Sequence, residues 1–527
     1  MLLGNGSSAT IDFMKWIAGL IMLSVVGEAR QLTGHTVLLQ PIVLCDDEGK
    51  SAAKANLSEA LIDLPFRRWD VDFQILEPIR WNRREFRDGE SDVDVIVKKA
   101  TEEGVFRHPG RIANMVFAKK INGRPAPNGL GQQPGWVTFI AQAGNSPLGQ
   151  DAFVVIHEVS HNLGLAHSVD DNEVPNDVPN VMGDGDFMDR IREDGITRNQ
   201  AATILKSPLV RETVRCLNGD EARKAYLDEN FEFYYDRLNR REVEAMTGKI
   251  MPKELDGAGV KAEARKRYEA AVVDFSKEER EVLLWMVGEF RKVLVGEFPL
   301  LANQPWELLK VKGDHCAGFP HTRGLSVVLS EKAVDRMMGK FKMHGKTKRA
   351  LEGVSTILVH EQFHVLQRCY PEKFARLYTE IYGLLDGVVA ENHWVAANEI
   401  SNPDGLDGNR WVIPHEGQFY WMKTMLKIED EPARMPQSFR EGVFPLDKRG
   451  KEYVTQSGGE GKPPKQVSGE VILKWKEQFP IRVGHDHPNE ISAYLFQAEL
   501  GRLLKGMKPS EDEMTRKTMA WCRKELR

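Results

Sequence analysis

The sequence has few cysteines, no strong excess of either charge and no long apolar run. Its 527 residues include five cysteines, and no two of them have the CxxC spacing of a thiolate zinc ribbon. This excludes a disulfide scaffold and a zinc ribbon. Lys and Arg number 72 against 77 Asp and Glu, and the net charge of -5 gives no electrostatic reason to expect nucleic acid as a partner. No apolar run approaches the roughly 20 residues that a membrane span needs.

A short apolar run near the N-terminus is typical of a targeting signal and is too short for a membrane span. Residues 16–26 are predominantly apolar, follow Lys15 and precede the sequence Gly-Glu-Ala. A positive charge, a short apolar segment and small residues at a cleavage site are typical of a secretory signal peptide. Because Asp12 places a negative charge ahead of this segment, we expect translation to start at Met14, within a signal peptide over 1–29. The mature chain would be secreted or extracytoplasmic (periplasm, cell surface or medium), with no stable membrane span.

Residues 35–209 alternate short apolar segments with helical patterns. The segments with the length and composition of strands are 37–44, 71–76, 111–117 and 136–141. Helical patterns cover 52–63 and 93–102, and a further helix is expected to begin near Ser146-Pro147. This order predicts an α/β domain whose sheet is mixed but mostly parallel.

One stretch of this domain carries a metal-site pattern. It reads His-Glu-Val-Ser-His-Asn-Leu-Gly-Leu-Ala-His, which is HExxHxxGxxH. On a helix, His157 and His161 lie one turn apart on one face, so both imidazoles can reach one ion. Gly164 permits the positive φ that ends the helix, and the turned chain can bring His167 back as a third ligand. Three ligands and an open position define a catalytic zinc site, beside which Glu158 can take a proton from water.

This stretch resembles the metzincin clan of zinc endopeptidases. The resemblance implies zinc as the cofactor, a protein or peptide as the substrate, and a methionine turn beneath the metal. Asn-Val-Met-Gly at 180–183 fits that turn and makes Met182 its structural methionine. The resemblance also implies that residues 136–141 form the edge strand to which an extended substrate pairs.

The remainder of the chain divides in two. Residues 210–274 are highly charged and helical in pattern, which predicts a helical connector. Residues 275–527 contain long helical patterns and a strand at 325–329, which predicts a mainly helical α+β domain. Within that domain, His-Glu-Gln-Phe-His follows the apolar stretch 354–359, as expected of a buried active-site helix.

The second HExxH sequence lacks its own third ligand. His360 and His364 share a helix face, with Glu361 beside them, but no glycine and histidine follow at metzincin spacing. A glutamate is the usual alternative, and the site looks like that of a gluzincin. The candidate third ligands are Glu380, Glu391, Glu399 and Glu490.

The C-terminal region also resembles a family of uncharacterised bacterial HExxH proteins. It shares Thr-Arg-Gly at 322–324, Ser-Asn-Pro-Asp at 401–404 and a late HPxE sequence that ends at Glu490. This resemblance, and not spacing, implies Glu490 as the third ligand. Glu391 and Glu399 stay open as alternatives, because their spacing is closer to that of many gluzincins.

The sequence therefore predicts an exported zinc metalloendopeptidase: a metzincin-like α/β domain followed by a zincin-like α+β domain, with one zinc ion in each. Glu158 and Glu361 would each serve as the general base. Arg323 and Tyr494 are candidates to polarise a carbonyl or steady an oxyanion. An alternative is that only one domain is catalytic and the other is a pseudo-peptidase or a substrate-binding module. A non-enzymatic adhesion module would leave both glutamates without a role.

Overall fold

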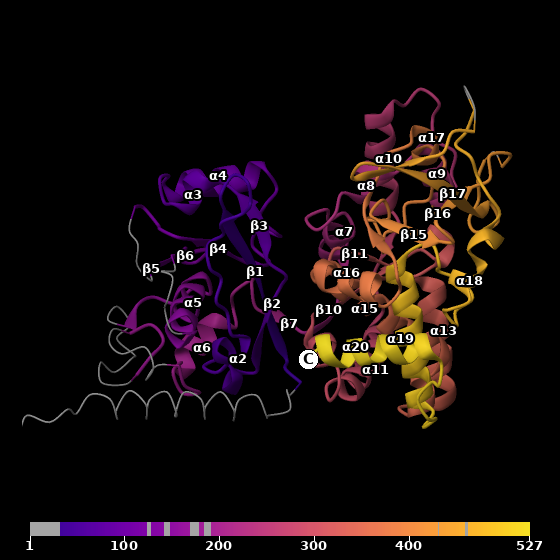
Figure 1. The fold of residues 1–527 in the computed structure, drawn as a ribbon. Coiled ribbons are helices and arrows are strands. Elements are labelled where there is room, and N and C mark those ends of the chain that lie inside the picture. The colour runs from indigo at the N-terminus through magenta and orange to yellow at the C-terminus, as the bar shows by residue number, and fades with distance from the viewer. Residues whose placement is uncertain are drawn as a thin grey trace, which may run out of the picture. The chain divides into compact units, whose positions relative to one another are not determined.

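The computed structural model describes residues 32–123, 128–141, 148–168, 179–183, 191–430, 432–458 and 462–527, and Figure 1 shows their fold. The chain divides after Arg211 into unit 1 and unit 2. The predicted signal peptide, the start at Met14 and the expected helix start at 146–147 lie outside the described residues. In the described part of the chain, no helix is long and apolar enough to cross a membrane.

The elements of unit 1 follow the predicted alternation. Its strands are β1 (His35–Cys45), β2 (Val71–Ile75), β3 (Ile79–Asn82), β4 (Ala113–Ala118), β5 (Asn128–Gly131) and β6 (Val137–Ala141). Its helices are α2 (Glu59–Asp63), α3 (Arg84–Arg87), α4 (Val93–Glu102), α5 (Leu148–Asn162) and α6 (Arg198–Ile204), with the short helix η1 (Arg67–Trp69). Strand β7 (Arg211–Glu212) lies at the boundary of the two units.

The sheet of unit 1 is mostly parallel, as predicted. Its order is β2-β1-β4-β6-β5, with β3 also paired to β1, and only β5 among these strands runs antiparallel to its neighbour. Alternate side chains of β1 enter two cores: Leu39 packs with α5 on one face, and Ile42 packs with α3 and α4 on the other. A parallel sheet covered on both faces explains why its strands read as continuous apolar runs. Figure 1 shows these helices on opposite faces.

The prediction that residues 136–141 form the edge strand is wrong. These residues form β6, which pairs with β4 on one side and β5 on the other. The edge is β5, whose sequence Asn-Gly-Leu-Gly has the composition of a loop. It is a strand because it pairs with β6 over four residues, Asn128–Gly131.

Unit 2 contains many short strands as well as helices. Its strands are β8 (Val214–Cys216), β9 (Val272–Val273), β10 (Trp306–Val311), β11 (His321–Arg323), β12 (Ser326–Ser330), β13 (Leu385–Asp386), β14 (Val388–Val389), β15 (Trp411–His415), β16 (Gln418–Leu426), β17 (Phe439–Arg449) and β18 (Glu452–Thr455). Its helices are α7 (Gly219–Tyr226), α8 (Tyr234–Arg237), α9 (Arg240–Thr247), α10 (Gly257–Glu269), α11 (Lys277–Leu294), α12 (Pro299–Asn303), α13 (Glu331–His344), α14 (Lys348–Leu351), α15 (Ile357–Cys369), α16 (Pro371–Glu380), α17 (His393–Ala396), α18 (Leu473–Lys476), α19 (Pro488–Leu504) and α20 (Glu513–Glu525). The short helices η4 (His315–Gly318), η5 (Gly353–Thr356) and η6 (Gly469–Ile472) complete the unit.

Two sheets organise unit 2. The first has the order β11-β12-β10-β8, in which β10 runs parallel to β12 and β8. The second has the order β13-β15-β16-β17-β18-β14 and is largely antiparallel. Helix α15 packs against β11 and β12 and against α19. Unit 2 is thus an α+β structure. It contains more strand than the mainly helical domain that the sequence predicts, and the additional strands are those of the second sheet.

The predicted connector over 210–274 is not a separate segment. Helices α7–α10 belong to unit 2, and Tyr226, Tyr234, Tyr235 and Tyr268 on or beside them are at most 1% exposed. These tyrosines pack in one core with residues of β10 and β12. The charges occupy the outer faces of amphipathic helices, whose inner faces complete the core.

Candidate metal centres

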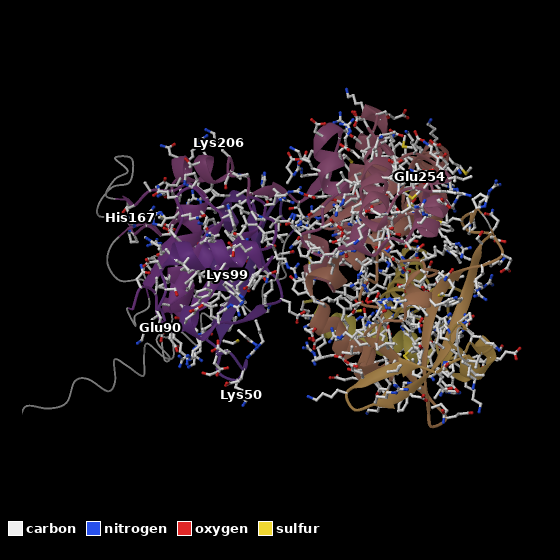
Figure 2. The ribbon with its side chains drawn as sticks, turned by 90° about the horizontal axis from the view of Figure 1, so that it is seen from above. Lys50, Glu90, Lys99, His167, Lys206 and Glu254 are labelled. Atoms are coloured by element: carbon white, nitrogen blue, oxygen red, sulfur yellow. The ribbon has the colours of Figure 1, made fainter. Side chains whose placement is uncertain are left out.

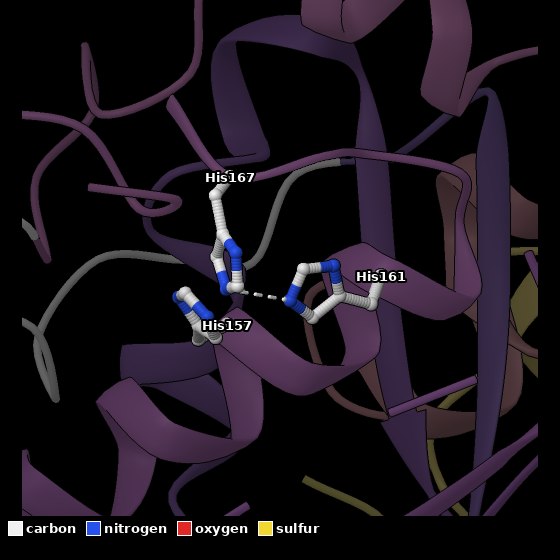
Figure 3. Close-up of side chains that lie close together, drawn as sticks. All are labelled: His157, His161 and His167. Carbon is white, nitrogen blue, oxygen red and sulfur yellow. Dashed lines mark hydrogen bonds between the residues drawn. The ribbon is translucent and has the colours of Figure 1, made fainter. Parts of the chain in front are cut away.

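Three histidines converge in unit 1. Helix α5 carries His157 and His161, and Gly164 takes a φ of +99° just after the helix, which only glycine adopts without strain. The chain then turns and brings His167 to the other two (Figure 3). One ring nitrogen from each lies within 4.8 Å of the others. His167 is the exposed member, and Figure 2 shows it at the outside of unit 1.

Backbone carbonyls determine which ring nitrogen carries the proton in two of these histidines. His157 Nδ1 lies 2.9 Å from the carbonyl oxygen of Val181, and His161 Nδ1 lies 2.8 Å from that of Leu165. A carbonyl oxygen only accepts, so each Nδ1 carries the proton and each neutral ring keeps its lone pair on Nε2. The Nε2 of His161 faces the Nε2 of His167 at 3.3 Å. This group suits a cation that prefers imidazole ligands, such as Zn²⁺.

Strand β5 covers the glutamate beside this group. Glu158 is 8% exposed, and burial raises the pKa of its carboxyl to about 7, although the N–H of Gly131 donates to it. A Cβ at Gly129 would lie 2.2 Å from Cγ of Glu158, and one at Gly131 would lie 2.4 Å from its backbone oxygen. Glycine is therefore required on this strand so that it can lie against the helix.

The predicted methionine turn lies next to the same group. The N–H of Gly183 donates to the carbonyl of Asn180 at 3.0 Å, and the side-chain oxygen of Asn180 accepts from the N–H of Met182 at 3.0 Å. Met182 is 1% exposed and packs in the core with Val181. The carbonyl of Val181 is the group that contacts His157. The turn therefore orients a histidine through its backbone.

The second group forms where α15 meets α19. His360 and His364 lie one turn apart on α15, and their Nε2 atoms are 3.1 Å apart. Pro488 starts α19 and His487 caps it, which places Glu490 in the first turn. The Oε2 atom of Glu490 lies 3.5 Å from His360 Nε2 and 3.6 Å from His364 Nε2. The structure thus brings Glu490 to the two histidines.

A glutamine fixes the proton of His364. The Nε2 atom of Gln367 donates to the carbonyl of Asn489 at 3.0 Å, which leaves its Oε1 to face His364 Nδ1 at 2.7 Å. Since Oε1 only accepts, the Nε2 of a neutral His364 carries a lone pair toward His360 and Glu490. Nothing singled out Gln367 in the sequence, although its i, i+3 spacing from His364 places it on the same helix face.

Burial and neighbouring charges shift the pKa values of the carboxyl groups around the second group. Burial alone would raise the pKa of Glu490, but His364 and His360 hold it well below its usual range. Burial raises the pKa of Glu361 well above its usual range, and the neighbouring Asp404 raises it further. Asp404 is 7% exposed and forms another ligand-type group with Glu361 and His364. The sequence placed Asp404 in the Ser-Asn-Pro-Asp sequence at 401–404 and gave no reason to expect it beside these histidines.

The alternative third ligands lie elsewhere. Glu391 and Glu399 line a cavity of about 660 Å³ whose wall does not include His360 or His364. Glu399 also forms an ion pair with Lys423 at 3.0 Å. Within the described residues, the ligand-type groups that contain both α15 histidines have Glu490 as their third member.

The two candidate oxyanion stabilisers have different surroundings. Arg323 is fully buried, forms an ion pair with Glu232 at 2.7 Å, and stacks over the ring of Tyr234. Its guanidinium therefore makes its contacts within the core, and Arg323 does not line the cavity beside His360. The ring of Tyr494 does line that cavity, with its centroid 4.5 Å from that of His360.

Comparisons with known proteins give little further guidance. No protein-family model matches the chain, and no curated protein matches it. Among solved structures, archaemetzincin from Methanopyrus kandleri matches at 14% identity with a TM-score of 0.23, over 33% of this chain and 95% of that one. A TM-score of this size does not establish a shared fold.

Proposed function

We propose that the chain is an exported zinc-dependent metallopeptidase with two zinc sites, one in each unit. The observation that carries the proposal is the orientation of the histidines. On His157, His161 and His364 an acceptor faces Nδ1 and holds its proton, so the neutral form of each ring directs its Nε2 lone pair at the other ligand-type atoms. Zinc-binding histidines usually donate the N–H of their other ring nitrogen to an acceptor of this kind.

The residues present fit zinc at both sites. His157, His161 and His167 would hold one ion, and His360, His364 and Glu490 the other. Imidazole and carboxylate are ordinary zinc ligands, and three of them leave a position open. A zinc ion so held polarises a scissile carbonyl and lowers the pKa of a bound water.

Each site also has a glutamate next to its first histidine. Glu158 and Glu361 are 8% and 3% exposed, and Oε2 of Glu361 has no hydrogen-bond partner. A buried carboxylate with a free oxygen can accept a proton from the attacking water and deliver it to the leaving amine. We propose a protein or peptide as the substrate, because the leaving group in this chemistry is an amine. The export of the chain is a proposal from its N-terminal sequence alone.

The test uses Glu158→Gln and Glu361→Gln, singly and together, with hydrolysis of fluorescently labelled casein and zinc content measured on each protein. Each single variant should lose part of the hydrolysis, and the double variant nearly all, while zinc stays bound. Glu254→Gln, at an exposed glutamate, is the matched control and should behave like the parent. A double variant as active as the parent would refute the proposal. If one single variant abolishes all hydrolysis, only that unit is catalytic and the other is a pseudo-peptidase or substrate-binding module.

A further inference from the structure

A cavity of about 390 Å³ lies beside the second metal group. His360, Glu361 and Glu490 form part of its wall, so a molecule in the cavity would lie next to the groups proposed to react. Ligand pockets span about 300–1,000 Å³. This cavity is at the small end of that range, which suits one or two residues of an extended peptide.

Much of the remaining wall is apolar. Met246, Cys316 and Ile400 line the cavity and are 4%, 6% and 8% exposed. Phe319 and Val483 also line it, yet they are 51% and 60% exposed. Neighbouring apolar side chains left in contact with water mark places where a ligand gains free energy by covering them. The cavity therefore offers an apolar side chain both a buried wall and an exposed rim.

The polar part of the wall is rich in carboxyl groups and, among its described residues, has no cationic partner for a ligand carboxylate. Four carboxylates line the cavity, and none of the described residues in its wall is a lysine or arginine. The four are Glu361, Asp404, Asp486 and Glu490. Asp486 accepts a hydrogen bond from the hydroxyl of Thr424 at 2.9 Å, and no described lysine or arginine forms an ion pair with it. Burial raises the pKa of Glu361 and Asp486, so these two carboxyls favour their neutral forms. An acidic side chain of the ligand would lose its hydration in this cavity without finding a lysine or arginine among the described wall residues.

We infer that the second site hydrolyses short peptides that carry a bulky apolar residue at the scissile bond, and that it rejects an acidic residue there. This inference rests on the proposed function. In the reaction, water adds its oxygen to the carbonyl carbon and the C–N bond breaks. Glu361 takes one proton from the water and delivers it to the leaving nitrogen. The apolar wall places the side chain of the substrate. Among the described wall residues no lysine or arginine could pair with an acidic side chain, and this sets the charge selection.

The experiment uses the full chain with Glu158→Gln, so that hydrolysis reports the second site. Two series of fluorogenic peptides serve as substrates, and within each series the peptides differ only at one residue, which is Leu, Phe, Gly or Glu. In the first series this residue contributes the nitrogen of the scissile bond, and in the second series it contributes the carbonyl. In one of the two series, kcat/KM for Leu and Phe should exceed that for Gly by at least about tenfold, the effect of filling an apolar pocket. The Glu peptide should be the poorest substrate.

Two rim variants test the cavity directly. Phe319→Ala and Val483→Asp change exposed side chains, so both should fold, and each should lower kcat/KM for the Phe peptide about tenfold. Leu503→Ala is the control: it truncates a side chain that is 44% exposed and outside the cavity wall, and it should change nothing. Binding of the same peptides to the Glu158→Gln, Glu361→Gln chain, followed by fluorescence anisotropy, gives a readout that needs no hydrolysis.

The outcomes separate this inference from the proposed function. Hydrolysis with no preference for Leu and Phe over Gly and Glu would overturn the inference and leave the function intact. A second outcome is that the chain binds no zinc and hydrolyses no peptide, yet binds the Phe peptide selectively, and Phe319→Ala weakens this binding. That outcome would support the selectivity and overturn the proposed function. Equal binding of the Phe and Glu peptides would overturn the selectivity in either case.

Discussion

The side chain of Gln367 orients His364 within the second metal group. Gln367 is 2% exposed, and besides His364 it contacts the carbonyl of Asn489, the hydroxyl of Ser492 and the hydroxyl of Tyr378. The variant Gln367→Met keeps nearly the same volume but removes every one of these polar contacts. We predict that it weakens zinc binding in unit 2 and leaves unit 1 unchanged.

The size of the effect follows from the contact between His364 and Gln367, which spans 2.7 Å. A neutral hydrogen bond contributes about 0.5–1.5 kcal/mol, which is about a 2- to 12-fold change in affinity at about 1.4 kcal/mol per tenfold step. Removing a partner that orients a metal-binding histidine commonly lowers metal affinity about 10- to 100-fold. These ranges meet near tenfold, so we expect the zinc dissociation constant of unit 2 to rise about tenfold.

The matched control is Gln362→Met on the same helix. Gln362 is 0% exposed and donates to the carbonyl of Pro305 at 2.9 Å, so its loss should also destabilise unit 2, without weakening zinc binding. The assay is competition with a chromophoric zinc chelator in a His161→Ala background, in which unit 1 is disabled, with thermal unfolding of both variants alongside. Equal zinc affinity in Gln367→Met and the parent would refute the reasoning. So would an equal loss of affinity in both variants.

Three further predictions concern the first site and the metal. Gly129→Ala should displace Glu158, slow hydrolysis by unit 1 by at least about tenfold, and lower its free energy of unfolding by about 1–3 kcal/mol; Gly288→Ala, with open space around the new Cβ, should do neither. In a Glu361→Gln chain, hydrolysis should fall as the pH drops below about 7, because a protonated Glu158 cannot accept a proton. A bound cation would shift this limb to lower pH, and a flat profile from pH 8 to 4 would contradict the assignment. Zinc at about 100 times its dissociation constant should raise the free energy of unfolding by about 2.7 kcal/mol, an increase that a chelator should reverse in a thermal scan.

Local sequence patterns predicted most of unit 1. Strands β1, β2 and β6 lie within a few residues of the apolar segments expected at 37–44, 71–76 and 136–141. Strand β5 could not be found in this way, because two glycines in four residues have the composition of a loop. Its place comes from pairing with β6 and from the close approach of Glu158, neither of which is a local property.

The organisation of unit 2 was harder to predict. The charge of residues 210–274 concealed the buried tyrosines, including Tyr226 and Tyr268, that tie this segment to the unit 2 core. The sheet formed by β15–β18 was also missed. Strand β17 reads Phe-Arg-Glu-Gly-Val-Phe-Pro-Leu-Asp-Lys-Arg, and such a mixture of charged and apolar residues becomes a strand only through its partners β16 and β18.

Spacing on a helix predicted the paired histidines, and it could not predict the third member of the second group. His157 and His161, like His360 and His364, come together because four residues make about one helical turn. Glu490 reaches His364 only because α19 packs on α15, a contact between segments far apart in the chain. The role of Gln367 depends on that same packing, because its side chain contacts Asn489 and Ser492 of α19. The side chain of Asp404 is held instead by the N–H of Thr322 on β11, which is also a contact between distant segments.

Metal content per chain tests the central claim most directly. Elemental analysis of the purified protein should find about two zinc ions per chain, falling to about one in His161→Ala and to about one in His364→Ala. Both variants remove a histidine from one group and leave the other group intact. A parent chain with no zinc, or one whose zinc content neither variant changes, would contradict the account.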